Sequence, residues 1–159
     1  MKQWEHARRS NTGIYALEFE DGAVILRAAN AASLRDIGAV KQVASSEICR
    51  GKRVRFQAEV STQDADGAGL WLGAATRDVQ IMDAMYNRLI TGSSEWKNIE
   101  LVIDVPSNAE YVSYGLWMKG SGCCLMRNPQ FDFVDQSVPL TQYSLLDRIA
   151  SDRWVERAN

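Results

Sequence analysis

Two tryptophans with glycine neighbours are the residues of this 159-residue chain whose type and spacing best suit ligand binding. Trp71 is flanked at two-residue spacing by Gly69 and Gly73, and Trp117 follows Gly115 in the same alternating pattern. Glycines beside an indole remove the side chains that would cover it, which leaves a flat apolar surface with a polar N–H at its edge. Such a surface stacks on sugar rings, so the pattern predicts a binding platform. The alternative is that both indoles fill the core.

Asp83, Tyr86 and Arg88 form a second candidate group, which is polar and aromatic and follows Trp71 along the chain. Its side chains have hydrogen-bonding reach suited to hydroxyl or carboxylate groups. In the alternative role, the arginine of this group bonds a neighbouring carbonyl and fixes its own loop. Gln42 is a further candidate if its strand lies beside the same face. The predicted ligand-binding residues are Trp71, Trp117, Asp83, Tyr86, Arg88 and Gln42.

Catalytic residues cannot be assembled into a nucleophile, base and acid, which argues against an enzyme. His6 is the only histidine, and neither a Gly-x-Ser-x-Gly elbow nor a zinc-binding histidine pair occurs. Cys49, Cys123 and Cys124 do not make a disulfide framework, because adjacent cysteines rarely bond to each other. We expect them to be small apolar residues in or near strands, with a redox switch as the alternative. No metal and no cofactor are expected.

The charge balance and the N-terminal residues limit the partners and the compartment. A net charge of -2 and a pI near 5.4 argue against a dominant surface for nucleic acid, which needs concentrated Lys and Arg. Residues 1–10 include charged side chains and precede no apolar run of the length that an export signal or a membrane span requires. We therefore expect a cytoplasmic protein with no nucleic-acid or membrane partner.

Alternation of apolar and polar residues predicts β-strands through most of the chain. It is clearest over 52–61, with an inward set of Val54, Phe56, Ala58 and Val60. The runs 98–105 and 111–119 are joined by a Pro-containing turn, so we predict that they pair as antiparallel neighbours.

Shorter β-like runs fill most of the remaining chain. An Asp-Gly turn signal joins 14–19 to 23–27 as a hairpin, and Asn128-Pro129 belongs at an edge or a bulge. Further strands are expected over 38–44, 69–76, 123–126 and 130–135, with a strand that leads into a loop at 79–87, a loop at 28–36 and a turn at 63–67. About nine short strands at even spacing predict an all-β fold, an antiparallel sandwich.

The pattern changes after Pro139, so we divide the chain into a sandwich over 1–138 and a tail over 139–159. Ser144, three residues before Asp147, resembles a capping box. A C-terminal α-helix is predicted from apolar residues at helical spacing, namely Leu146, Ile149, Ala150 and Trp154. Because this stripe is too narrow to bury itself, it should dock on the sandwich or on another subunit, and we favour a homodimer.

The order of the strands and their punctuation resembles the jelly-roll, galactose-binding-like domains, which include many carbohydrate-binding modules. The resemblance covers about 13–135 and is strongest to poorly characterised bacterial segments, some attached to transcription regulators or hydrolases. It is carried by 50–58 (RGKRVRFQA), 68–72 (AGLWL), 88–96 (RLITGSSEW), 103–106 (IDVP) and 114–122 (YGLWMKGSG). It implies an antiparallel jelly-roll β-sandwich.

The chain departs from that group at 123–129 (CCLMRNP). Where the group usually continues with a tryptophan strand and paired aspartates, Arg127 and Asn128 replace the acidic pair. The resemblance therefore implies no calcium or sugar contact from an acidic pair at this place.

The sequence and the resemblance together predict a noncatalytic module that binds a small polar ligand, with a carbohydrate as the first choice, on a concave sheet face. The alternative is an intracellular sensor or protein-interaction domain with no sugar ligand. The C-terminal helix would then form part of the contact with the partner.

Overall fold

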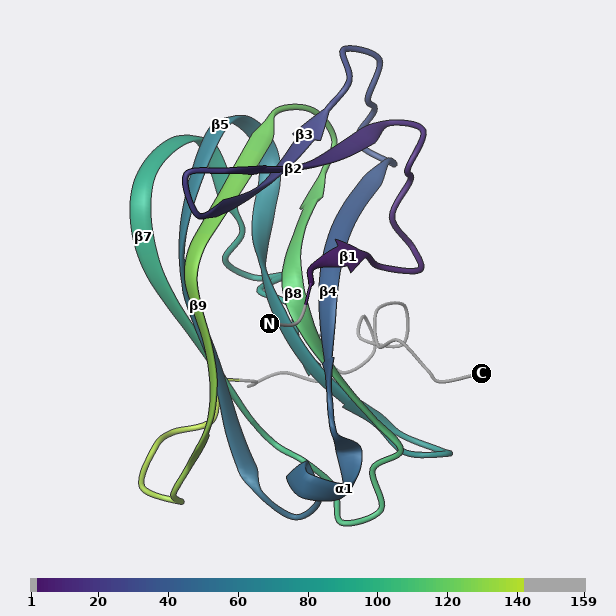
Figure 1. Ribbon diagram of the computed structural model, residues 1–159, viewed down its shortest axis with the longest axis vertical. Coiled ribbons are helices and arrows are strands. Elements are labelled where there is room, and N and C mark those ends of the chain that lie inside the picture. The colour runs from purple at the N-terminus through teal and green to yellow at the C-terminus, as the bar shows by residue number, and fades with distance from the viewer. Residues whose placement is uncertain (1–2, 142–159) are drawn as a thin grey trace.

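Antiparallel strands make up most of residues 3–141, the part of the chain that this computed structural model describes (Figure 1). They confirm the predicted all-β sandwich. In chain order the elements are β1 (Glu5–His6), β2 (Tyr15–Glu20), β3 (Ala23–Ala28), β4 (Ile37–Ala44), α1 (Ser46–Cys49), β5 (Arg53–Ala75), β6 (Gln80–Asp83), β7 (Ile90–Asp104), β8 (Tyr111–Lys119) and β9 (Cys123–Val134).

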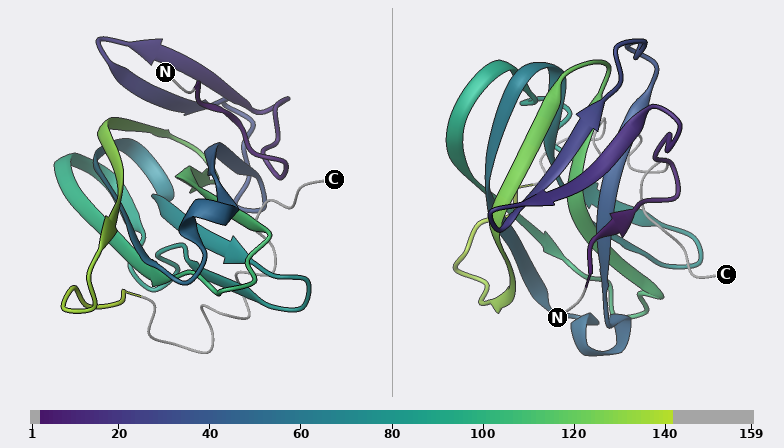
Figure 2. Two further views of the ribbon diagram at one scale, coloured as in Figure 1. Left: turned by 60° about the horizontal axis from the view of Figure 1, so that its bottom comes forward. Right: turned by 45° about the horizontal axis from the view of Figure 1, so that its top comes forward.

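The long strand β5 belongs to both layers of the sandwich. Its first half pairs with β7 on one side and β9 on the other, and its second half pairs with β8 and β6. One layer continues from β9 to β3 and β2, and the other from β8 to β4 and β1. Figure 2 shows the β2–β3 hairpin along one side of the molecule. The two layers enclose the core between them.

The turn predicted at 63–67 is wrong, because the chain bends there without reversing. The register against β7 shifts between Val60 and Ala68, and Asp64 takes a φ of 49°. A bulged bend and a tight turn draw on the same residue types, so composition did not separate them. The bend carries β5 from one layer into the other.

The predicted pairing of 98–105 with 111–119 is also wrong. Among the described strands, β7 and β8 both pair with β5, at its opposite halves, and lie in different layers. The Pro106 connection therefore crosses between layers. Alternation showed which side chains face inward, but it carries no information on which strand is the partner.

Other strand predictions are confirmed. β2 and β3 form the expected hairpin, and β4 occupies the run expected at 38–44. The two runs expected at 123–126 and 130–135 are one strand, β9, with a register shift opposite Asn128-Pro129 and a φ of 54° at Asn128. This is the bulge that the Asn-Pro pair predicted.

The core between the layers holds the side chains that alternation assigned to it. The predicted inward residues of the first half of β5 are all at most 2% exposed, namely Val54, Phe56, Ala58 and Val60. They meet Leu72, Leu101 and Leu116 from other strands in one apolar cluster. The inward face of the clearest strand was thus assigned correctly.

The chain stays hydrogen-bonded to the sandwich as far as Thr141. The Thr141 backbone N–H donates to the Val102 carbonyl at 3.0 Å, and the Thr141 hydroxyl accepts from the Val102 N–H at 2.8 Å. The predicted C-terminal helix lies outside the described residues.

Candidate functional site

Trp71 and Trp117 lie on the same face of the β5–β8 pair, but the structure buries both of them. Trp71 is 0% exposed and Trp117 is 2% exposed. In the strand register Trp71 lies opposite Gly115, and Trp117 lies opposite Gly69. A Cβ at Gly115 would lie 2.7 Å from the Trp71 ring, so this glycine makes room for the indole. The prediction of an exposed stacking platform is therefore wrong.

Both indoles belong to a small apolar cluster on the outer face of this layer. The Trp117 Nε1–H donates to the Ala84 carbonyl at 3.0 Å, and Trp71 Nε1 lies 3.5 Å from Ser113 Oγ. The Tyr86 ring packs against Trp117 with 5.4 Å between centroids. The indoles thus hold the β6–β7 connection against the sheet.

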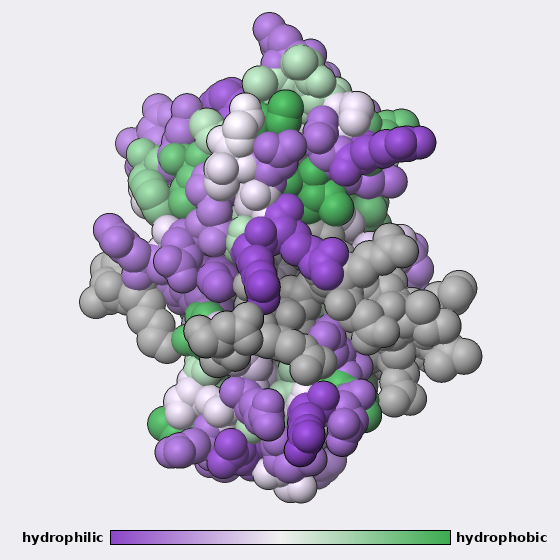
Figure 3. All heavy atoms as spheres, turned by 90° about the vertical axis from the view of Figure 1, so that its right-hand side faces the viewer, coloured by the Kyte–Doolittle hydropathy of each residue, from purple (hydrophilic) through white to green (hydrophobic). Residues whose placement is uncertain are grey.

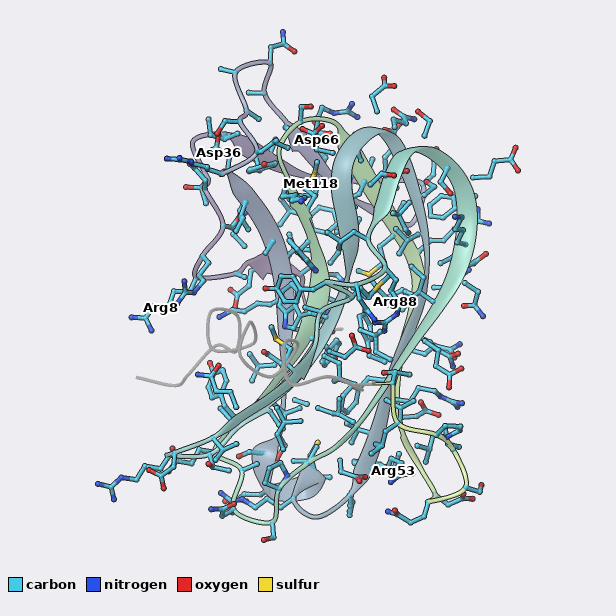
Figure 4. All side chains as sticks on the ribbon, turned by 180° about the vertical axis from the view of Figure 1, so that it is seen from behind. Arg8, Asp36, Arg53, Asp66, Arg88 and Met118 are labelled. Carbon is cyan, nitrogen blue, oxygen red and sulfur yellow. The ribbon has the colours of Figure 1, made fainter. Side chains whose placement is uncertain are left out.

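Asp83 and Arg88 come together as predicted, and Arg88 fixes its own loop as in the alternative, but through the Asp83 carboxylate rather than through a neighbouring carbonyl. Asp83 is 0% exposed, and its Oδ2 accepts from Arg88 Nη2 at 2.5 Å. Its Oδ1 accepts from the Met85 N–H at 2.9 Å, and Arg88 Nη1 also donates to Asn87 Oδ1. Figure 4 shows Arg88 on the side of the molecule seen from behind. Ligand binding by Asp83, Tyr86 and Arg88 stays a prediction.

Gln42 lies in β4 beside β8, but on the face opposite to the indoles. Its register partner is Tyr114, whose hydroxyl donates to Gln42 Oε1 at 3.0 Å. The structure therefore does not bring Gln42 together with Trp71 and Trp117. It places Gln42 in a different hollow.

That hollow is a crevice of about 700 Å³ between the two layers, which we call the inter-layer crevice. Residues of β4 and β8 line one side, residues of β3 and β9 line another, and the segment before β1 lies over it. The lining residues are Gln3, Trp4, Phe19, Gly22, Ala23, Val24, Gln42, Tyr114, Pro129, Gln130 and Phe131.

Aromatic rings form the inner wall of the inter-layer crevice. Tyr114 and Phe131 stack with centroids 4.7 Å apart, and Trp4 meets Tyr114 edge-on at 5.9 Å. Phe56 backs them from the core, 4.8 Å from Tyr114. Rings in contact hold one another in place, so this wall is preformed.

The lining of the inter-layer crevice carries no net charge. Among the described lining residues none is Asp, Glu, Lys, Arg or His. Burial raises the pKa of Tyr114, with a smaller contribution from Cys49, so its hydroxyl stays protonated at neutral pH. Gln130 adds an amide at the rim, where its Oε1 accepts from Gln57 Nε2 at 2.9 Å. Such a site offers rings and neutral hydrogen-bonding groups.

Sequence reasoning selected only Gln42 from this crevice. Tyr114 and Phe131 lie in strands, where alternation does not distinguish the wall of a crevice from the core, while Trp4 precedes a two-residue strand that carries no periodicity. The signal that could have found them is the number of large rings directed at one end of the core. That signal depends on which strands pair.

The three cysteines are the other candidates for chemistry that the sequence raised, and all three lie within the described residues. Cys49, Cys123 and Cys124 are buried thiols, as expected, and burial raises the pKa of Cys123 and Cys124. Within residues 3–141, no group of at least three His, Cys, Asp or Glu side chains is placed to hold a metal ion. No helix in that part of the chain is long and apolar enough to cross a membrane.

Known structures share this fold at low sequence identity. The N-terminal CBM22-1-GH10 modules of Clostridium thermocellum xylanase 10B, complexed with xylohexaose, superpose with a TM-score of 0.59, 10% identity, and coverage of 86% of this chain and 27% of that one. The C-terminal family 22 carbohydrate-binding module of the same Xyn10B gives 0.57, 12% identity and coverage of 86% and 89%. A family 4 module gives 0.56, 11% identity and coverage of 82% and 86%. The fold is thus a β-sandwich of the carbohydrate-binding-module type, which confirms the resemblance seen in the sequence.

A sequence relative comes from a different kind of protein. Over 98 residues, 60% of this chain, the sequence is 37% identical to an uncharacterized HTH-type transcriptional regulator, YbfP, of Bacillus subtilis (strain 168). The match covers 33% of that protein, so the chain spans about a third of the length of this curated relative. No family model matches the chain.

Proposed function

We propose that this chain is a noncatalytic module that binds a neutral carbohydrate in the inter-layer crevice. The observation that carries the proposal is the lining, which combines stacked rings with amides and a hydroxyl and includes no charged side chain. The predicted ligand class is kept, and the predicted place moves from Trp71 and Trp117 to the opposite face of the layer.

Each part of the lining matches a part of a sugar. The C–H face of a pyranose packs on an aromatic ring, and Trp4 offers a half-buried indole at the mouth. Sugar hydroxyls exchange hydrogen bonds with amide and phenol groups such as those of Gln42 and Tyr114. A volume of about 700 Å³ accommodates a short oligosaccharide. The carbohydrate-binding modules that share the fold add support for this class.

The test is isothermal titration calorimetry of the full chain with neutral mono- and oligosaccharides, including xylo-oligosaccharides. We expect binding in the millimolar range or tighter by at least one of them. Trp4→Ala and Gln42→Ala should each weaken it about tenfold, because each removes one recognition contact.

Trp96→Ala is the matched control for loss of an indole. Trp96 is also half-buried, but it stacks under Arg127 at 4.0 Å, on β7 and away from the crevice lining. Binding should survive in this variant. If no sugar binds at millimolar concentration, or if Trp96→Ala weakens binding as much as Trp4→Ala, the proposal is wrong.

The relative in a transcriptional regulator favours a second candidate function, a sensor or protein-interaction domain. In that role the sandwich would dock a DNA-binding partner, and sugar binding would not be required. Light scattering of this chain mixed with the part of YbfP outside the matched segment would test it. A complex of defined mass would support the interaction role, and two proteins that keep their separate masses would contradict it.

A further inference from the structure

A second hollow, of about 420 Å³, lies on the outer face of the β4–β8 layer, and we call it the outer pocket. Its residues come from the connection after β1, the loop before β4, the β6–β7 connection and the ends of β4 and β8. The lining residues are Arg9, Leu34, Ile37, Tyr86, Leu89, Trp117 and Lys119. The fold therefore builds this pocket from segments that are far apart in the sequence.

Most of the outer pocket is apolar. Trp117 forms part of its floor, and because the indole N–H already donates to the Ala84 carbonyl, the ring contributes apolar surface. Tyr86 and Leu89 pack against the same cluster. Leu34 lies at the rim with 67% of its surface exposed, so it extends the apolar wall of the pocket toward solvent. Figure 3 shows hydrophobic groups gathered among hydrophilic ones on the side of the molecule toward β4.

The polar part of the outer pocket is cationic. Arg9 and Lys119 line it, and no acidic residue among the described ones does so. Within residues 3–141 neither cation has an ion-pair partner, whereas Arg53, Arg55 and Arg88 each pair with a carboxylate. The chain as a whole has a net charge of -2, so this positive site runs against the overall balance.

The charge of Lys119 acts on Asp66, but the carboxylate of Asp66 is already hydrogen-bonded to Ser121. Its Oδ2 accepts from the Ser121 N–H at 2.8 Å and from Ser121 Oγ at 3.0 Å. These hydrogen bonds, and to a smaller extent Lys119, hold the pKa of Asp66 below its usual range. Asp66 therefore does not replace an anionic ligand in the pocket.

We propose that the outer pocket binds a small organic carboxylate with an aromatic or branched aliphatic body. The carboxylate would pair with Arg9 and Lys119, and the body would cover Leu34 and the apolar floor. A neutral sugar would leave both cations without an anion, and inorganic phosphate would leave the apolar wall exposed. The ligand class, the face and the charge all differ from those of the inter-layer crevice.

The experiment is calorimetry of the full chain with 3-phenylpropanoate and with its neutral isostere, 3-phenylpropanamide. The two probes have the same body, so their difference measures the anion requirement. We expect the carboxylate to bind in the millimolar range or tighter and the amide to bind about tenfold more weakly. Equal binding of the two, or no binding of the carboxylate, overturns the proposal.

Two variants locate the binding. Lys119→Met keeps the apolar stem and removes the charge, and Leu34→Asp places an anion at an exposed rim position where the fold should tolerate it. Each should weaken 3-phenylpropanoate binding about tenfold. Lys97→Met, on the exposed side of β7, is the matched control and should leave binding unchanged. Unchanged binding in Lys119→Met and Leu34→Asp overturns the assignment to this pocket.

The same variants distinguish carboxylate binding in the outer pocket from sugar binding in the inter-layer crevice. Trp4→Ala and Gln42→Ala should leave 3-phenylpropanoate binding unchanged, and Lys119→Met should leave sugar binding unchanged. Loss of carboxylate binding in Trp4→Ala would place both ligands in the inter-layer crevice and would overturn the outer site.

Discussion

At the scale of single residues, tryptophan and glycine act together on the outer face of the β5–β8 pair. Trp71 lies against Gly115 across the strands, so the ring can lie flat where any Cβ would displace it. Burial of both ring faces gives an indole a larger stabilising role than an exposed stacking position gives. The buried indole of Trp71 therefore stabilises the fold.

Trp71→Ala should destabilise the fold about as much as Phe56→Ala, by about 3 to 5 kcal/mol each. Both side chains are 0% exposed, so each truncation removes a large buried ring and leaves a cavity. An exposed stacking platform would instead make Trp71→Ala the milder change. Urea unfolding of the two variants measures the order. A Trp71→Ala variant within about 1 kcal/mol of the parent would restore the exposed platform.

Tyr15 provides a pH-dependent test. Its buried hydroxyl donates to the Gly120 carbonyl at 2.5 Å and lies 3.0 Å from the Asp36 carbonyl, joining β2 to the far end of the β4–β8 layer. Burial, and then the charges of Asp36 and Asp66, raise the pKa of Tyr15 above its ordinary value of 10.0. Figure 4 shows both aspartates at the same end of the molecule.

Tyr15→Phe should lower the free energy of unfolding by about 1 to 3 kcal/mol at neutral pH, because the buried Gly120 carbonyl loses its donor. A raised pKa in the folded state means that the stabilisation is complete below the unfolded pKa of 10.0 and is lost as pH rises above it. The gap between parent and variant should therefore narrow above about pH 10. Denaturant unfolding across neutral and alkaline pH measures it, and a gap that is constant with pH would contradict the role of the hydroxyl.

The sequence predicts a residue's role when the role depends on its own strand, and does not when the role depends on contacts with other segments. Period-two alternation predicted that Phe56 faces inward, and the structure confirms this. It could not predict that the outer face, which carries Trp71, is itself covered, because Ala7 reaches it from a distant segment and Met82 and Ala84 reach it from β6 and the connection after it. For the same reason the sequence did not single out the rings of the inter-layer crevice.

At the scale of elements, the ion pair between Asp83 and Arg88 holds the β6–β7 connection in its conformation. Asp83 ends β6 and holds both the Met85 N–H and Arg88, so residues 84–89 are fixed from inside. Met85 adopts a φ of 60°, a conformation that a side chain other than glycine takes only where its surroundings enforce it. The sequence identified Asp83, Tyr86 and Arg88 as a group because they are close along the chain.

Arg88→Met should destabilise the protein more than the double variant in which Asp83→Asn is added. The single change leaves a fully buried carboxylate without its cation, at a cost of about 2 to 3 kcal/mol, since Arg88 itself is partly exposed. The double variant removes the buried charge and keeps an oxygen for the Met85 N–H. Urea unfolding and amide exchange of residues 84–89 measure both. Equal stability of single and double variants would show that the pair contributes nothing through charge.

At the scale of the whole molecule, one layer separates the two proposed sites. The β4–β8 sheet has Gln42 and Tyr114 on its inner face, toward the neutral crevice, and Trp117 on its outer face, toward the cationic pocket. The sequence could predict the sandwich, because its strands are regular. It could not predict either hollow, since each depends on how segments distant in sequence meet.

The tail of the chain supplies the last prediction, which concerns assembly. The helix predicted from Leu146, Ile149, Ala150 and Trp154 would be marginal in water unless its apolar stripe docked on another surface. We expect the full chain to be a homodimer in light scattering and a chain ended after Thr141 to be a monomer with a lower melting temperature. Ending there keeps the hydrogen bonds of Thr141 to Val102, so the sandwich is left intact.

A full-length Trp154→Ala variant is the control for this truncation, because it shortens nothing and removes the largest side chain of the stripe. It should dissociate at higher concentration than the parent if the stripe forms the dimer contact. A truncated chain that keeps the parent's mass in light scattering would show that the contact lies elsewhere on the sandwich. If it also keeps the parent's melting temperature, the stripe docks on neither surface, and the two faces of the β4–β8 sheet are then the places to search for the dimer contact.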